Sequence, residues 1–190
     1  ALTDHAGQMD PLMAWHLDKL CWLYQSPTFC TLAGWEWSSP EVGHHNVILK
    51  GRMSTLVGET ESIDTLYARL PPNGFITIPH HSADAKFPQD FTRVKDQYTR
   101  LVEVYQACRG NFEFDGAFRQ AGSADVVGSF VQDALNDGHV FGIIASTDHG
   151  FGQSYACVAA KSLARADLFD ALHARRTYGA TTKGMLVDLR

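Results

Sequence analysis

The sequence of 190 residues predicts an α/β protein with a mainly parallel β-sheet, either open or closed into a barrel. Three observations support this class. Segments with helical spacing of apolar residues alternate with short apolar segments typical of strands. No linker, low-complexity tract or repeat interrupts them. Hydrophobic residues make up 45% of the chain, which is enough for one well-packed core. We therefore expect a single domain over residues 1–190.

The expected helices and strands follow one another along the whole chain. In order, they are a helix over 10–25, strands over 28–37 and 45–50, a helix over 60–70, strands over 75–79 and 101–105, a helix over 123–136, a strand over 140–145, a helix over 162–175 and a strand over 177–189. Strands separated by helices favour parallel pairing, because a crossover returns the chain to the same end of the sheet.

Capping residues and helix breakers define the expected helices. Asp10 is a favourable N-cap, and Pro11 suits the first turn. Thr60 is expected to cap the second helix, which the Pro-Pro-Asn-Gly sequence at 71–74 ends. The last helix places four apolar residues on one face, namely Leu163, Leu168, Phe169 and Leu172.

The strand predictions depend on composition and on turns. Aromatic and β-favouring residues fill 28–37, and a Pro-Glu-Val-Gly turn separates them from the apolar segment 45–50. Residues 1–7 resemble the tail of a further strand. Because the chain begins at Ala1 without an initiator Met, we expect a segment upstream that completes this strand.

Composition limits the partners of this protein. The formal net charge of −5 gives no basic surface for nucleic acid or for an anionic membrane. No apolar stretch approaches the roughly 20 residues that a membrane span needs. The four cysteines lack C-x-x-C spacing and do not indicate a redox compartment. We expect a soluble protein of either cytoplasm or periplasm, with a small anionic molecule as its partner.

Side chains that can bind metals or transfer protons stand at the ends of five expected strands. They are Asp4 and His5, Glu36, His80 and His81, the segment from Glu103 to Cys108, and Asp148 with His149. The tripeptide Thr-Asp-His occurs at both the first and the last of these ends. Because the carboxyl ends of parallel strands converge on one face of the sheet, we expect one shared site.

The residue types in this set indicate a metal centre. Clustered imidazoles and carboxylates are stable when a cation holds them, and mixed His, Asp and Glu ligands suit Zn, Mn or Fe. Such ions activate water for hydrolysis. Each residue also has an ordinary structural explanation. His5 and Asp148 are compatible with caps or turns, Glu36 with a solvated charge and Glu103 with a hydrogen-bond acceptor. Cys108 is compatible with a small buried residue, and the remaining histidines His16, His139 and His173 with plain surface or core residues. The coincidence of five strand ends favours the metal centre.

Six segments in order along the chain resemble one known family. They are ALTDHAG, GWEW with GHHNVILK, IPHH, LVEVYQACRG, GIIASTDHGFGQSYA and LFDALHARRTYGATT. Together they resemble the DUF3604 group of the PHP (polymerase and histidinol phosphatase) superfamily of metal-dependent hydrolases. The resemblance implies a distorted (β/α)7 barrel with a site for one to three divalent ions at the carboxyl ends of its strands.

The resemblance also implies roles for individual residues. The metal ligands that it implies are His5, Glu36, His80, Cys108, Asp148 and His149, with Cys108 at a position where many relatives have His. The substrate and catalytic contacts that it implies are His45, His81 and Arg176, with either His44 or His45 near the mouth of the pocket. An arginine suits a phosphate because the guanidinium group matches its geometry.

The sequence departs from the family pattern at its start. The opening His-x-His element of the first strand has no counterpart before Ala1, so we expect a barrel that lacks its first strand. An open barrel edge favours pairing with a second copy of the chain or with a neighbouring domain.

Three functions are compatible with these features. The first is a metal-dependent hydrolase of phosphoesterase type, in which metal-activated water attacks a small phosphate ester. The alternative is a catalytically weak or inactive PHP-like module that serves binding or assembly. A third is a redox or metal-storage role through Cys108.

Overall fold

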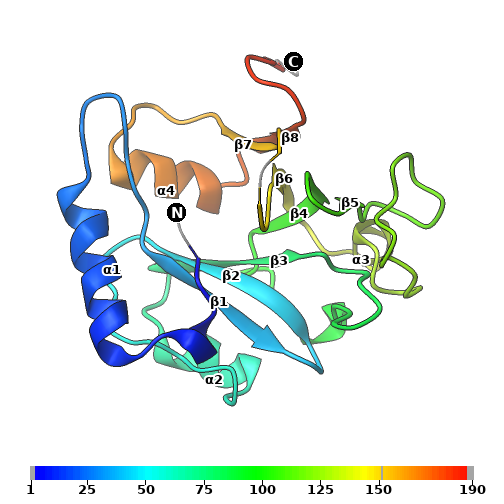
Figure 1. Ribbon diagram of the computed structural model, residues 1–190, viewed down its shortest axis with the longest axis horizontal. Helices are drawn as coiled ribbons and strands as arrows, with labels where there is room; N and C mark the ends of the chain where they lie inside the picture. Colours follow the sequence, from blue (N-terminus) through cyan, green and yellow to red (C-terminus); the bar gives the residue numbers. More distant parts are fainter. Residues whose placement is uncertain (1–2, 151, 188–190) are drawn as a thin grey trace.

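The computed structural model describes residues 3–150 and 152–187, and this part of the chain is a mixed α/β structure (Figure 1). Its helices are α1 (Pro11–Leu23), α2 (Ile63–Arg69), α3 (Val131–Asn136) and α4 (Arg165–His173), with 3-10 turns at Ala6–Gln8 and Phe91–Arg93. Its strands are β1 (Gly34–Ser39), β2 (Gly43–Leu49), β3 (Phe75–His80), β4 (Leu101–Gln106), β5 (Gly110–Asn111), β6 (Gly142–Ser146), β7 (Tyr155–Val158) and β8 (Thr177–Ala180).

The strands form small sheets that are mostly antiparallel. β1, β2 and β3 pair antiparallel in that order, β5 pairs antiparallel and β6 parallel with β4, and β7 pairs antiparallel with β8. The first two sheets meet where the amide of Thr77 donates to the carbonyl of Tyr98 at 2.9 Å, next to a parallel bridge between Thr77 and Thr99. The strands therefore follow one another across a curved surface without closing.

The two faces of the β1–β2–β3 sheet have different surroundings. Because successive side chains of a strand point to opposite faces, Trp35, Trp37 and Val47 lie on one face, in the main hydrophobic core with residues of α1 and α2. The other face carries Glu36 and His44 and, farther along, a second apolar cluster with α4. Figure 1 shows α1 and α2 on one side of these strands and α4 on the other.

The predictions of a mainly parallel sheet and of a distorted (β/α)7 barrel lacking its first strand are therefore wrong. Only residues 40–42 connect β1 to β2, a link that allows a hairpin but no crossover helix, so the two strands must be antiparallel. The described residues contain no closed barrel, and the one parallel pair of named strands is β4 with β6.

Several expected elements are shorter in the structure. The strand expected over 28–37 begins only at Gly34, the helix expected over 123–136 begins at Val131, and the strand expected over 177–189 ends at Ala180, with residues 188–189 outside the described part. The antiparallel strand β7 was not expected. By contrast, His5 does form a parallel bridge with Glu36, as a strand tail would.

The longest helix in the described residues, α1, has 13 residues, and none there has the length and hydrophobicity to cross a membrane.

Candidate metal centre

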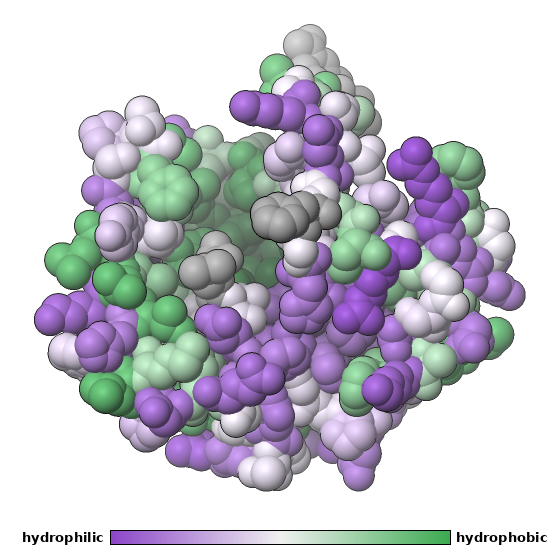
Figure 2. All heavy atoms as spheres, viewed as in Figure 1, coloured by the Kyte–Doolittle hydropathy of each residue, from purple (hydrophilic) through white to green (hydrophobic). Residues whose placement is uncertain are grey.

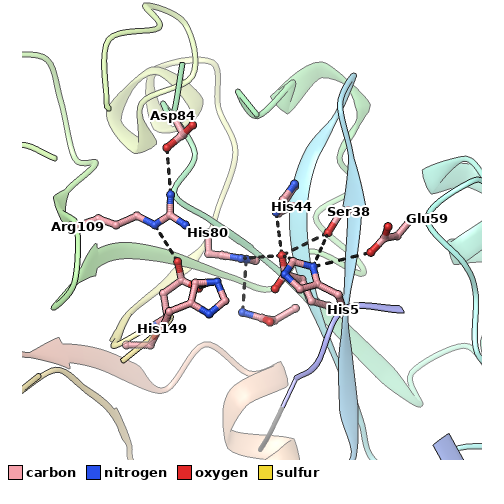
Figure 3. Close-up of polar contacts among 12 residues, drawn as sticks. His5, Ser38, His44, Glu59, His80, Asp84, Arg109 and His149 are labelled. Atoms are coloured by element: carbon pink, nitrogen blue, oxygen red, sulfur yellow. Dashed lines mark hydrogen bonds and ion pairs between the residues drawn. The ribbon is translucent and has the colours of Figure 1, made fainter. Parts of the chain in front are cut away.

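Four buried side chains converge at one end of the β1–β2–β3 sheet. They are Glu36 of β1, His44 of β2, His80 at the end of β3 and the following His81, and each offers a ligand atom within 4.8 Å of the others. The Nδ1 atom of His44 lies 2.8 Å from Oε1 of Glu36, and Nε2 of His80 lies 3.5 Å from the same oxygen. In Figure 3, His44, His80 and His5 point toward one another around this position.

Strand register brings the first three of these residues together. His44 pairs with His80, and Glu36 pairs with Asn46 two positions beyond His44. Cross-strand neighbours and residues two apart share a face of the sheet, so the three side chains point the same way. The antiparallel meander thus builds the cluster from neighbouring strands.

A strained backbone conformation adds His81 to the cluster. Regular alternation would turn His81 away from the face that carries His80. Its φ of 40° lies in the left-handed region, which non-glycine residues rarely adopt and which often occurs at functional sites. The turn at this residue keeps the two imidazoles adjacent, with ring centroids 4.5 Å apart.

Burial and neighbouring charges shift the pKa values of these groups in different directions. Burial would raise the pKa of Glu36, but its contacts with His44 and His80 outweigh burial and hold that pKa well below the ordinary range. Burial, together with the charges of His80 and His44, lowers the pKa of His81 to about 2. Burial would also lower the pKa of His80, but its contact with Glu36 and the nearby carboxylates of Glu103 and Asp148 raise it. Glu36 is therefore ionised and His81 neutral at pH 7.

The donor set suits a metal ion. It combines three imidazoles with one carboxylate, which are ligands of Zn, Mn and Fe. His81 is only 2% exposed, and its Nδ1 atom has no hydrogen-bond partner, although buried polar atoms are nearly always paired. The cluster of Glu36, His44, His80 and His81 could hold a metal ion.

Five of the expected site residues line one cavity of about 800 Å³. They are His5, Glu36, His80, Asp148 and His149, and the buried Glu103 joins them. The Nδ1 atom of His5 lies 3.5 Å from Oε1 of Glu36, and the rings of His5 and His149 are stacked with centroids 6.2 Å apart. These residues therefore lie around one cavity, although the strands that carry them run differently from the expectation.

Asp148 is engaged in an ion pair beside the cluster. Its Oδ2 atom accepts a hydrogen bond from Nε of Arg109 at 2.9 Å, and Nη1 of Arg109 donates to Asp84 at 3.2 Å (Figure 3). Asp148 also has a φ of 58°, which turns the chain after β6. Arg109 was not among the expected site residues, whereas its neighbour Cys108 in the LVEVYQACRG segment was.

Three expected site residues lie outside the centre. Cys108 and Arg176 are exposed, and neither lines the cavity. His45 is fully buried on the opposite face of β2, where its ring centroid lies 5.8 Å from that of Trp37. His44, its neighbour, is the residue that faces Glu36. Because adjacent residues of a strand point to opposite faces, only one of His44 and His45 can face the site. The register with β1 and β3 shows that this residue is His44.

Replacing His45 with Leu is expected to leave metal binding unchanged. Burial, followed by the charges of His80 and His44, lowers the pKa of His45 to about 3, so the residue is a neutral core side chain whose two ring nitrogens lack partners. An apolar side chain removes those unpaired groups, so H45L should keep or raise the free energy of unfolding, by up to about 2 kcal/mol. Urea unfolding and metal titration of H45L check this. A loss of metal affinity in a folded H45L protein would place His45 in the centre.

No family model, curated protein or solved structure matches this chain. The fold and the cluster alone therefore define its class, a mixed α/β protein with a buried Glu/His cluster that could hold a metal ion.

Proposed function

We propose that this protein is a metal-dependent hydrolase that acts on a small phosphate ester, and that it is related to the DUF3604 group of the PHP superfamily. The observation that carries the proposal is the buried cluster of Glu36, His44, His80 and His81, of which Glu36 and His80 line a cavity of about 800 Å³. Cavities of this size, with a few convergent polar groups, are typical of small-molecule sites.

The proposed cofactor is a divalent ion, Zn, Mn or Fe, held by the four cluster residues. Such an ion lowers the pKa of water that it binds and neutralises charge on a phosphoryl group. We propose one ion at the cluster. A second ion would lie next to His5, whose Nδ1 atom is 3.5 Å from Oε1 of Glu36, and metal titration measures whether one or two ions bind.

The chain's own residues would position the substrate. His5 and His149 stand at the cavity wall, and their imidazole N–H groups can donate hydrogen bonds to an anionic oxygen. Arg109 holds Asp148 through its 2.9 Å hydrogen bond and so fixes this side of the cavity. Side chains fixed in this way keep a reacting group in place, which is a large part of catalysis in such sites.

Hydrolysis of p-nitrophenyl phosphate and of its diester tests the proposal. The Mn-loaded protein is expected to release p-nitrophenol, to lose activity with a chelator and to regain it when the metal is restored. H80A is expected to lower kcat/KM at least about 100-fold, because it removes a group that binds the metal. H16A is the matched control, since His16 is exposed on α1.

Two results would overturn the hydrolase proposal. The first is activity that is unchanged in H80A or resists the chelator. The second is a protein that binds metal at the cluster but hydrolyses neither ester, which would support a binding or assembly role instead.

A further inference from the structure

The cavity next to the metal cluster has a polar end and an apolar end. Besides polar residues such as Gln8, Asn46 and Thr147, its lining includes eight aliphatic residues, among them Ile48, Ile78 and Leu172. Figure 2 shows a hollow with a hydrophobic interior beside α4. Aliphatic side chains offer no atom that can bind a metal, so this part of the cavity must contact another part of a ligand.

The apolar wall continues the same sheet face that carries the cluster. Ile78 precedes His80 by two positions in β3, and Ile48 follows Asn46 by two positions in β2. Two residues along a strand span about 7 Å, so a group bound at the cluster is only a few carbon–carbon bonds from the aliphatic wall. From the opposite side, Ile144 of β6 and Leu172 of α4 face the same space.

The size and chemistry of the cavity favour a ligand with a hydrocarbon group. About 800 Å³ is more than a phosphate group alone can fill and lies in the range of sites for drug-sized ligands. The described residues that line the cavity include no Phe, Tyr or Trp, so the wall offers aliphatic contact and no aromatic stacking. A sugar would lose hydrogen bonds to water against such a wall, whereas an alkyl chain would lose none.

We propose that the substrate is a phosphate monoester of an aliphatic alcohol, with its phosphate at the cluster and its alkyl chain against Ile48, Ile78 and the α4 side of the cavity. This inference rests on the proposed function and names the substrate class. Hydrolysis would add one water across the P–O bond and release inorganic phosphate and the alcohol, with the proton from water going to the alcohol oxygen.

Binding of alkylphosphonates, which cannot be hydrolysed, tests the inference without relying on activity. Affinities of methyl-, butyl- and hexylphosphonate for the Mn-loaded protein are measured by calorimetry. Each methylene is expected to increase affinity about threefold, so the hexyl compound, which has five more methylenes, should bind roughly 240-fold more tightly than the methyl compound. Equal affinities, or no measurable binding of hexylphosphonate, would overturn the inference.

A matched pair of variants locates the effect. Leu168 is half-buried in the cavity wall, whereas Leu163 is exposed just before α4 and does not line the cavity. L168N is expected to weaken hexylphosphonate binding about tenfold and to leave methylphosphonate unchanged, and L163N should change neither. Equal losses in both variants would contradict the assignment of the wall.

The two proposals fail in different ways. If affinity rises with chain length but no ester is hydrolysed, the alkyl site stands and the hydrolase proposal fails. If p-nitrophenyl phosphate is hydrolysed but affinity does not change with chain length, and hexyl phosphate is cleaved no faster than glucose 6-phosphate, the hydrolase proposal stands and the alkyl site fails.

Discussion

E36Q is expected to weaken binding of Zn or Mn at least about 100-fold, which corresponds to roughly 2.7 kcal/mol. Glu36 supplies the only carboxylate of the four-residue cluster, and its contacts with His44 and His80 hold its pKa low, so it carries a full negative charge at pH 7. Glutamine has nearly the same shape but no charge, so the substitution removes the attraction for a cation and keeps the packing. Calorimetric titration of the metal-free protein measures the effect.

E59Q is the matched control for this substitution. Glu59 is also a carboxylate near the cavity, with Oε1 3.8 Å from Nδ1 of His5, but it is outside the cluster and its side chain is 33% exposed. E59Q should change metal affinity less than about threefold. Urea unfolding shows whether the metal-free E36Q protein is folded. We expect its free energy of unfolding to be about 1–3 kcal/mol lower, because His44 and His80 lose a charged partner. Equal affinities of folded E36Q and the original protein would exclude Glu36 as a ligand.

Metal affinity is expected to fall at least about tenfold between pH 8.0 and pH 5.5. The cause is His80, whose pKa is raised above its ordinary value because its contact with Glu36 and the charges of Glu103 and Asp148 outweigh its burial. Below that pKa, His80 holds a proton that the metal must displace, so affinity decreases about tenfold per pH unit; above it, affinity no longer depends on His80. Glu36 and His81 do not contribute, because the first stays ionised and the pKa of the second is about 2.

Titrations in buffers of different ionisation enthalpy check the origin of this dependence. At pH 6, metal binding should release about one proton, and the released fraction should decrease toward pH 8. A dissociation constant that does not vary with pH would contradict a metal bound through His80. A rise in affinity as the pH decreases would contradict any binding mode in which the metal displaces a proton from His80.

Five residues that the sequence placed at one site line one cavity, whereas the fold expected around them is wrong. The expectation that polar strand ends converge relied on parallel strands. Glu36 and His80 instead meet because β1 and β3 both pair antiparallel with β2, and only His5 joins them through a parallel bridge to Glu36. In both arrangements, side chains on one face of adjacent strands lie close together. The short turn between 37 and 45 was visible in the sequence and, taken alone, would have indicated a hairpin.

The ends of the other elements depended on tertiary contacts that a sequence pattern does not show. The helix expected from residue 123 begins late because Ser123 donates from Oγ to Asp84 at 2.6 Å and accepts at its carbonyl from the amide of Ala85 at 2.8 Å. Strand 28–37 begins late in part because the carbonyl of Thr31 accepts from Nε of Arg165 at 2.8 Å. Such long-range contacts outweigh local propensity.

The individual ligands were harder to predict than the site. His44 and His45 have the same local sequence context, and a shift of one position in register would exchange their faces. Cys108 follows β4 and Arg176 directly precedes β8, but both residues are exposed. His81 joins the cluster through its positive φ, which no residue type at that position signalled.

The most direct test of the central claim is the position of a bound metal in crystals grown with Zn, found by anomalous diffraction at the zinc edge. The account predicts one strong peak within bonding distance of Glu36, His44, His80 and His81. A strong peak elsewhere, for example between His5 and His149 with the four cluster residues unbound, or no peak at all at saturating Zn, would contradict it.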